Sequence, residues 1–117
     1  LTVVLDLGLP GQTYNIASGE THSNREVVED ICQILDRLSP RGDGTRHATH
    51  IQTVKDRPGH DRRYALSAGK LEAELHWRPE TAFCQGLEET VTWYLENRDW
   101  VDAVQSHYKG ERLGRAS

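Results

Sequence analysis

The chain has 117 residues, of which 36% are hydrophobic and 27% are charged, with a formal net charge of −4. This length and composition suit one small domain and exclude the disordered, collagen-like and disulfide-dense classes. The acidic balance also argues against a dedicated nucleic-acid-binding protein, although it leaves room for a local basic pocket that holds a phosphate.

The first half of the chain predicts one long helix between two short strands. Residues 1–7 fit a helix end or a strand, and the glycines at 8 and 11 end that element. Residues 13–17 predict a strand. Ser23 and Glu26 form a capping-box pattern ahead of apolar residues at helical spacing. These apolar residues are Val27, Val28, Ile31, Leu35 and Leu38. The helix should end before Pro40, and residues 50–54 predict the second strand.

The second half predicts further helices. Ser67 can cap a helix over residues 68–75, and Thr81 can cap the next one. The inner face of that next helix should hold Phe83, Leu87, Val91, Tyr94 and Leu95. A weaker helical pattern follows around Trp100, and the end from Gly110 should be frayed. We therefore expect one α/β domain over residues 1–117, small and mostly helical, with two or three short strands.

The most polar segment is the run from Lys55 to Arg63, KDRPGHDRR, which contains four cationic side chains, one histidine and two aspartates. Pro58 and Gly59 predict a sharp turn, and the glycine lets a ligand approach the backbone closely. Arginine side chains match phosphate oxygens as paired donors. We interpret the run as an anion-binding loop for a phosphate or pyrophosphate. The alternative, favoured on charge alone, is a solvated loop with internal Asp–Arg pairs.

The start of the first long helix is a second candidate for an anion site. Its unpaired backbone amides and its dipole attract negative charge. Asn24 could add a directional donor and acceptor there. The alternative is that Ser23 and Asn24 only cap the helix.

Several other functions find no support in the sequence. His47, His50 and His60 complete no zinc pattern, so we expect exposed loop histidines and no metal site. The glycines do not form a dinucleotide-binding fingerprint, and no nucleophile–base pair is evident. Cys32 and Cys84 are interpreted as small hydrophobic residues of a reducing compartment, with a disulfide as the alternative. The aromatic residues at helix-related positions predict core packing rather than base stacking; they are Trp77, Trp93, Tyr94 and Trp100.

Targeting signals are also missing from the sequence. It contains no apolar run of membrane length and no secretion signal, so we expect a cytoplasmic protein without a membrane partner. The chain begins at Leu1 and contains no methionine, which we interpret as a sign of an excised or truncated piece, with processing of the start as the alternative.

Four segments together carry a resemblance to a known family. They are PGQTYNI at 10–16, DRPGHDRRYA at 56–65, AGKLxxELxWxP at 68–79 and GLxxTVxWY at 86–94. In this order they resemble the C-terminal region of the dTDP-glucose 4,6-dehydratases, which are extended short-chain dehydrogenase/reductases. The match covers roughly residues 1–110. The RPGHDRRYA run is the specific part, whereas TYNI and WxP are shared more widely.

The resemblance implies that the parent protein is a lyase that converts dTDP-glucose to dTDP-4-keto-6-deoxyglucose. Such enzymes oxidise C4 with NAD, eliminate water across C5–C6 and return the hydride to C6. NAD, a Tyr-x-x-x-Lys pair and an Asp–Glu pair belong to the N-terminal Rossmann domain of the family. No tyrosine of this chain has a lysine four positions later. We therefore expect no catalytic residue and no cofactor-binding residue here, and no turnover by this chain alone.

Carried over by position, the resemblance implies a substrate site for the nucleotide end of the sugar nucleotide. Its residues are Asn24, Asp56, Arg57, Pro58, Gly59, His60 and, by a weaker alignment, Tyr108. Arg57 would contact the pyrophosphate. Where the family usually has Gly-Gly after Asn-Ile, this chain has Ala17-Ser18, so the backbone path of that turn can differ.

The expected partners are dTDP-glucose or dTDP, bound weakly because the other half of the pocket would be absent. Two alternatives remain open. The chain could come from a related sugar-nucleotide epimerase or GDP-sugar dehydratase, although the RPGHDRRY run argues against this. It could also be a non-catalytic interaction module. Self-association through apolar surface left by the missing domain is a further expectation.

Overall fold

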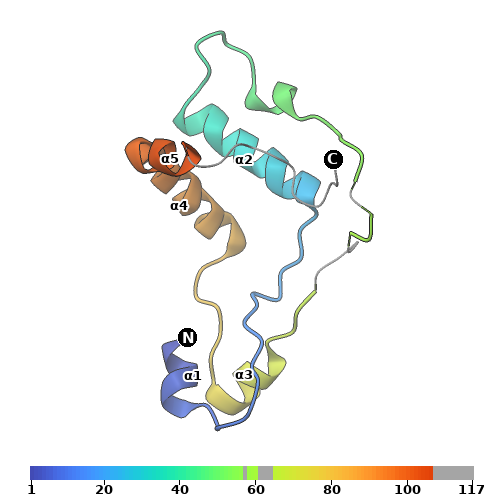
Figure 1. The fold of residues 1–117 in the computed structure, drawn as a ribbon, viewed down its shortest axis with the longest axis vertical. Helices are drawn as coiled ribbons and strands as arrows, with labels where there is room; N and C mark the ends of the chain where they lie inside the picture. Colours follow the sequence, from blue (N-terminus) through green and yellow to red (C-terminus); the bar gives the residue numbers. More distant parts are fainter. Residues whose placement is uncertain (57, 61–64, 107–117) are drawn as a thin grey trace.

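The computed structural model describes residues 1–56, 58–60 and 65–106, and it folds them into helices joined by extended chain (Figure 1). In chain order the elements are α1 (Thr2–Leu7), α2 (Asn24–Leu38), the 3₁₀ helix η1 (His47–His50), α3 (Gly69–Leu75), α4 (Phe83–Glu96) and α5 (Arg98–Gln105). The mostly helical character that the sequence predicted is confirmed, and residues 1–7 resolve as a helix rather than a strand.

The helices form two groups at opposite ends of an elongated molecule (Figure 1). At one end α2 packs on α4 and on η1, and α4 packs on α5; at the other end α1 packs on α3. Residues 12–23 and 76–82 run between the two ends (Figure 1). The accessible surface is 10186 Å², whereas a compact protein of this mass would expose roughly 6,400 Å². The fold is therefore open.

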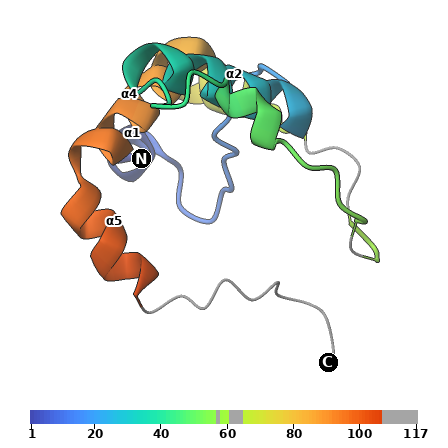
Figure 2. The ribbon, with the colours of Figure 1, turned by 90° about the horizontal axis from the view of Figure 1, so that it is seen from above.

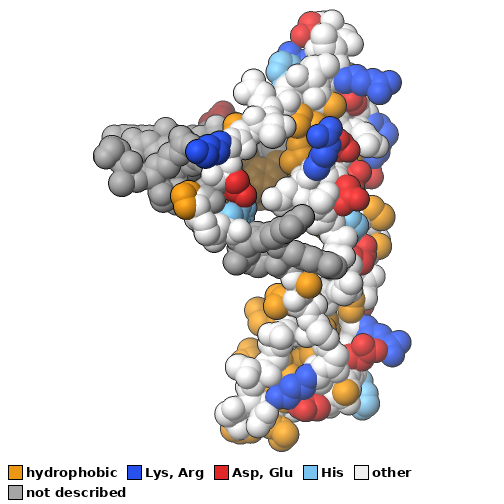
Figure 3. Space-filling model, turned by 90° about the vertical axis from the view of Figure 1, so that its right-hand side faces the viewer, with side chains coloured by type: hydrophobic (Ala, Val, Ile, Leu, Met, Phe, Trp, Pro, Cys, Tyr) orange, Lys and Arg blue, Asp and Glu red, His pale blue; other side chains and the backbone are white. Residues whose placement is uncertain are grey.

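Each group has its own small core. Leu71 and Leu75 are buried where α3 meets α1, and Leu71 is 2% exposed. Cys32, Ile34 and Val91 are buried at the other end. Val28 and Leu38 were predicted on the inner face of α2 but are exposed, whereas Cys32 and Ile34, which lie on nearly opposite sides of the helix, are buried. Hydrophobic side chains also gather over the end of the molecule that holds α1 and α3 (Figure 3).

The two predicted strands do not form among the described residues, which is a correction to the α/β expectation. A strand needs a neighbouring strand to pair its backbone groups. The segment 13–17 lies against α3 instead, where the Tyr14 hydroxyl donates to Glu74 (2.9 Å) and Lys70 Nζ donates to the Thr13 carbonyl (3.2 Å). The Lys70 ammonium also lies 4.7 Å from the centre of the Tyr14 ring. Residues 51–54 are extended without a strand partner.

The predicted start and end of α2 are confirmed. The Ser23 amide donates to Glu26 Oε2 (2.7 Å), and the Glu26 amide donates to Ser23 Oγ (3.2 Å), which completes the capping box. The helix ends at Leu38, with Ser39 as its C-cap, ahead of Pro40.

The predicted caps of the later helices need correction. Thr81 does not cap α4, because that helix begins at Phe83 and Thr81 lies one residue before the cap position. The Glu20 carboxylate accepts from the Phe83 amide instead, at 3.2 Å. For α3 the cap position is likewise one residue later than predicted, although Ser67 Oγ does accept from the Gly69 amide (3.2 Å).

Both cysteines are unpaired, so the alternative of a disulfide is wrong for this structure. Cys32 is buried, and burial raises the pKa of its thiol, whereas Cys84 is exposed on α4. Across the described residues, every helix is too short or too polar to cross a lipid bilayer.

The capping box generates a stability prediction. Replacing Ser23 by alanine removes the acceptor of the Glu26 amide, and such a loss typically costs about 1 kcal/mol. We expect the Ser23→Ala variant to unfold at lower urea concentration when helical circular dichroism is followed. The control is Thr81→Ala, because Thr81 does not serve as a cap and should change stability by less than about 0.5 kcal/mol. Equal destabilisation by the two variants would contradict the assignment of the cap.

Candidate functional site

The predicted turn in the polar run is present at Pro58 and Gly59. Gly59 has φ +68°, a left-handed conformation that suits glycine and strains other residues. Among the described residues beyond its two chain neighbours, no atom lies within 4 Å of the position that a Cβ on Gly59 would occupy.

The side chains on either side of this turn contact each other. His60 Nδ1 lies 2.7 Å from Asp56 Oδ1, and the side chains are 29% and 70% exposed. This pairing closes the bend across four residues. The remaining predicted residues Arg57 and Tyr108 lie outside the described residues, as do Arg62 and Arg63.

Asn24 is the first residue of α2, and it is exposed. The capping box pairs the backbone amides of Ser23 and Glu26 with side-chain oxygens. The backbone amides of Asn24 and Arg25 have no hydrogen-bond partner in the described part of the chain. The Glu26 carboxylate accepts the Ser23 amide, and this hydrogen bond lowers its pKa. The beginning of α2 therefore offers two N–H donors and the Asn24 amide group to an anion.

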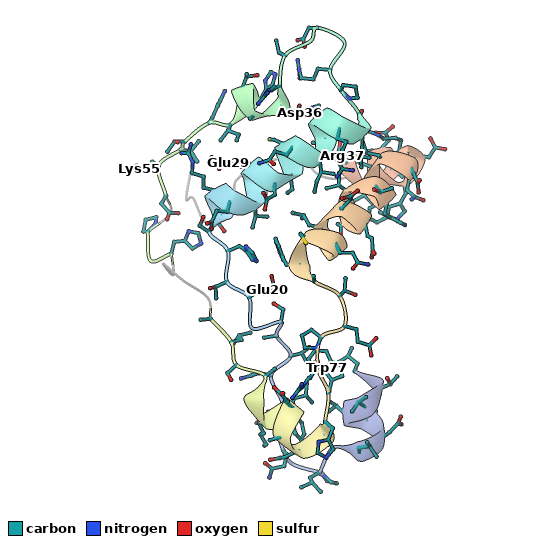
Figure 4. The ribbon with its side chains drawn as sticks, turned by 180° about the vertical axis from the view of Figure 1, so that it is seen from behind. Glu20, Glu29, Asp36, Arg37, Lys55 and Trp77 are labelled. Carbon is teal, nitrogen blue, oxygen red and sulfur yellow. The ribbon has the colours of Figure 1, made fainter. Side chains whose placement is uncertain are left out.

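The bend and the beginning of α2 lie on the same side of the molecule (Figures 1 and 4). Figure 4 shows Lys55, which leads into the bend, beside the half of α2 that carries Glu29. Glu29 in turn accepts from Arg25 Nε at 2.7 Å. The structure thus places the two described parts of the predicted site, the bend and the beginning of α2, on one side of the molecule (Figures 1 and 4).

Two ion pairs hold α2 in place, one to η1 and one to α4. Asp36 Oδ1 accepts from the His47 amide (2.8 Å) and lies 2.7 Å from His47 Nδ1. These hydrogen bonds lower the pKa of Asp36, and the bond from the backbone amide has the largest effect. Arg37 pairs with Glu88 of α4 at 2.8 Å. The expectation that His47 is an exposed loop histidine is wrong: it is half-buried, because it anchors η1 to α2.

A further junction joins the segment before α2 to the beginning of α4. Glu20 accepts the Phe83 amide (3.2 Å) and lies 3.4 Å from His22 Nε2. The His22 ring stacks on the Phe83 ring, with centroids 4.1 Å apart. Sequence analysis missed this junction, because no local pattern connects residues 63 positions apart.

Several surface hollows lie away from the bend. One of about 730 Å³ follows α4, one of about 350 Å³ lies between α2 and α4, and one of about 360 Å³ lies beside the loop after α2. In the described residues, no three histidine, cysteine or carboxylate side chains converge as metal ligands would.

The chain is similar to known proteins over most of its length. The family profile described as GDP-mannose 4,6 dehydratase matches residues 4–90. A relative from Xanthomonas campestris, named dTDP-glucose 4,6-dehydratase, is 47% identical over 97% of this chain and 33% of its own length. A protein of the same name from Escherichia coli is 44% identical over 95% of this chain and 32% of its own length. The chain thus spans about a third of these curated relatives.

A solved structure is also similar. The crystal structure of a dTDP-glucose 4,6-dehydratase from Bacillus anthracis in complex with NAD superposes with a TM-score of 0.70 and 41% sequence identity. The match covers 85% of this chain and 28% of that one.

The described residues of this chain do not themselves fit NAD. A dinucleotide site needs a glycine-rich turn between a strand and a helix, so that the pyrophosphate meets the helix N-terminus. Here Gly8 and Gly11 follow helix α1, and the segments leading into α2, α3 and α4 are not strands.

Glu26 provides a pH test of the beginning of α2. Its folded-state pKa is lowered, so its contribution to stability is present above its unfolded pKa and is lost as pH falls through the folded pKa. Glutamine at this position keeps a hydrogen-bond acceptor but does not titrate. We expect the unfolding free energy of Glu26→Gln to fall less than that of the original chain below about pH 4. Urea unfolding from pH 6 to pH 2 measures this.

The control for this test is Glu80→Gln, a change at an exposed carboxylate with no hydrogen bond in the described chain. It should follow the pH profile of the original chain. Parallel profiles for Glu26→Gln and the original chain would show that Glu26 does not hold the capping box.

Proposed function

The chain belongs to the family described as GDP-mannose 4,6 dehydratase, and we propose that it forms the sugar-nucleotide-binding part of a dTDP-glucose 4,6-dehydratase. The observation that carries the proposal is the match of relatives with this name to 95–97% of the chain at 44–47% identity. The complete enzyme would be a cytoplasmic lyase that converts dTDP-glucose to dTDP-4-keto-6-deoxyglucose, with NAD held outside these 117 residues.

In this proposal the bend and the beginning of α2 bind the diphosphate together. The unpaired amides of Asn24 and Arg25 would donate to phosphate oxygens, since the first turn of a helix favours negative charge. The left-handed turn at Gly59 would let the backbone approach the ligand. Arg57 would supply a paired donor to the pyrophosphate, and Tyr108 would complete the substrate contacts from the C-terminal end.

The Asp56–His60 contact would support this arrangement by closing the bend before the ligand arrives. A loop that is already ordered loses less entropy on binding. The carboxylate of Asp56 also bears a negative charge, and its hydrogen bond with His60 (2.7 Å) turns one of its oxygens toward the ring and away from an incoming phosphate.

The second candidate is a GDP-sugar dehydratase, which the description of the family profile favours. The two candidates share the diphosphate and differ in the base. The names of the relatives and the RPGHDRRY run support thymidine.

The expected behaviour of the chain in isolation is weak nucleotide binding without turnover. The 117 residues contain no Tyr-x-x-x-Lys pair to activate the C4 hydroxyl. The exposed leucines in α1 and just before it, namely Leu1, Leu5 and Leu7, support the expectation of self-association through that end of the molecule.

Titration of dTDP into the chain tests the proposed site. Loss of one charge-assisted contact weakens binding by about tenfold or more. We therefore expect Arg57→Ala to raise the dissociation constant for dTDP by about that factor in isothermal titration. The matched control is Arg46→Ala, which removes an exposed arginine outside the bend and should leave dTDP binding unchanged.

Failure of dTDP to bind, or equal binding by Arg57→Ala and the original chain, would overturn the site assignment. Competition with GDP and UDP then tests the base. Displacement of dTDP by lower concentrations of GDP would favour the GDP-sugar candidate over the thymidine one.

A further inference from the structure

An exposed aromatic cluster lies where α4 meets α5. Trp93, Tyr94 and Trp100 contact each other edge to face, with ring centroids 5.1–6.3 Å apart. Their exposed fractions are 44%, 48% and 50%. The expectation that these three side chains pack in the core is therefore wrong. Half-exposed aromatic clusters are typical of surfaces that bind other proteins.

The junction at Asn97 creates this cluster. The Asn97 amide and its side chain both donate to the Trp93 carbonyl, at 3.0 and 2.8 Å, and end α4 there. Asn97 is also the N-cap residue of α5, and α5 turns away from the axis of α4 (Figure 2). The turn brings Trp93 and Trp100 together, although they are seven positions apart. The cluster is thus fixed by the backbone and is available without rearrangement.

The surface around the cluster is strongly acidic. Residues 80–106 contain six carboxylates and one cationic side chain, Arg98. Glu88 is neutralised by Arg37 of α2. Within the described chain, no cation pairs with Glu96, Asp99 or Asp102. Glu96 lies on α4 with Trp93, and the two aspartates lie on α5 with Trp100.

A groove of about 730 Å³ continues from the cluster along α4. Trp93 and Cys84 provide apolar surface in it, and Glu89 and Glu96 provide charge. Its described lining residues all come from α4: Cys84, Gln85, Glu88, Glu89, Thr92, Trp93 and Glu96. The groove therefore presents apolar side chains and carboxylates together on one face of α4.

We propose that this α4–α5 surface docks a basic amphipathic helix of a partner protein. Apolar side chains of such a helix would cover the aromatic cluster, and its lysines or arginines would meet the unpaired carboxylates. A nucleic acid or an anionic membrane would be repelled by the same carboxylates. A second copy would bring two acidic surfaces together, so this surface is not suited to self-association through itself.

A pair of synthetic helical peptides tests the proposal with the full 117-residue chain. One peptide carries leucine on one face and lysine on the other, and the second replaces every lysine by glutamate. Fluorescence anisotropy of labelled peptide measures binding. We expect the lysine peptide to bind and the glutamate peptide not to bind. The affinity of the lysine peptide should fall as salt rises from about 50 to about 500 mM, because salt screens the attraction between exposed charges.

Two variants locate the surface. Trp100→Ala should weaken binding of the lysine peptide by about tenfold or more, as expected for a central aromatic contact. Glu96→Lys should weaken it by a few-fold, as expected for a rim charge. The matched controls are Leu5→Ala and Asp6→Lys on α1, which change an exposed leucine and an exposed carboxylate at the other end of the molecule. Both controls should bind the peptide like the original chain.

Because Glu96→Lys alters only an exposed side chain, it keeps the test decisive if Trp100→Ala fails to fold. Equal binding of both peptides, or unchanged binding by Glu96→Lys and Trp100→Ala, would overturn the proposal. A doubled solution mass that Trp100→Ala abolishes would also overturn it, in favour of a second copy. Addition of dTDP should leave peptide binding unchanged, which separates this surface from the proposed nucleotide site.

Discussion

The packing of α2 against α4 is the constraint on which the rest of the arrangement depends. Cys32, Ile34 and Val91 are buried at this end of the molecule, where α2 packs on both α4 and η1, and the Arg37–Glu88 pair joins α2 to α4. Exposed ion pairs contribute little to stability. The burial of apolar side chains therefore determines the position of α2, and the ion pair helps to orient α2 relative to α4. Once α2 is placed, Asp36 holds η1, and the chain leaves η1 toward the bend.

The local features of the fold were predictable, and the long-range ones were not. The capping box at Ser23 and the stop before Pro40 are short-range signals, so the bounds of α2 could be predicted closely. The segment around Tyr14 has the residues of a strand, but its contacts are made with α3. The cap of α4 comes from Glu20, which lies far away in the sequence. Hydrophobic periodicity and residue propensity carry no information about contacts between residues that are distant in the sequence.

The same division applies to the candidate site and to the aromatic residues. The Pro58–Gly59 turn and the exposed beginning of α2 follow from residue types, whereas the placement of His47 against Asp36 depends on how η1 returns to α2. Helical spacing predicted which side of α4 is apolar, but exposure depends on which neighbour covers that side. Tyr94, which the spacing placed on that side, is half-exposed for this reason.

The central claim is that the bend and the beginning of α2 together bind the diphosphate of a thymidine sugar nucleotide. Backbone amide NMR of the labelled chain during addition of dTDP tests it most directly, because it reports each N–H donor separately. The account predicts that the amides of Asn24, Arg25 and Gly59 shift together along one binding curve. Shifts confined to the groove along α4, with the amides of Asn24 and Gly59 unchanged, would contradict it.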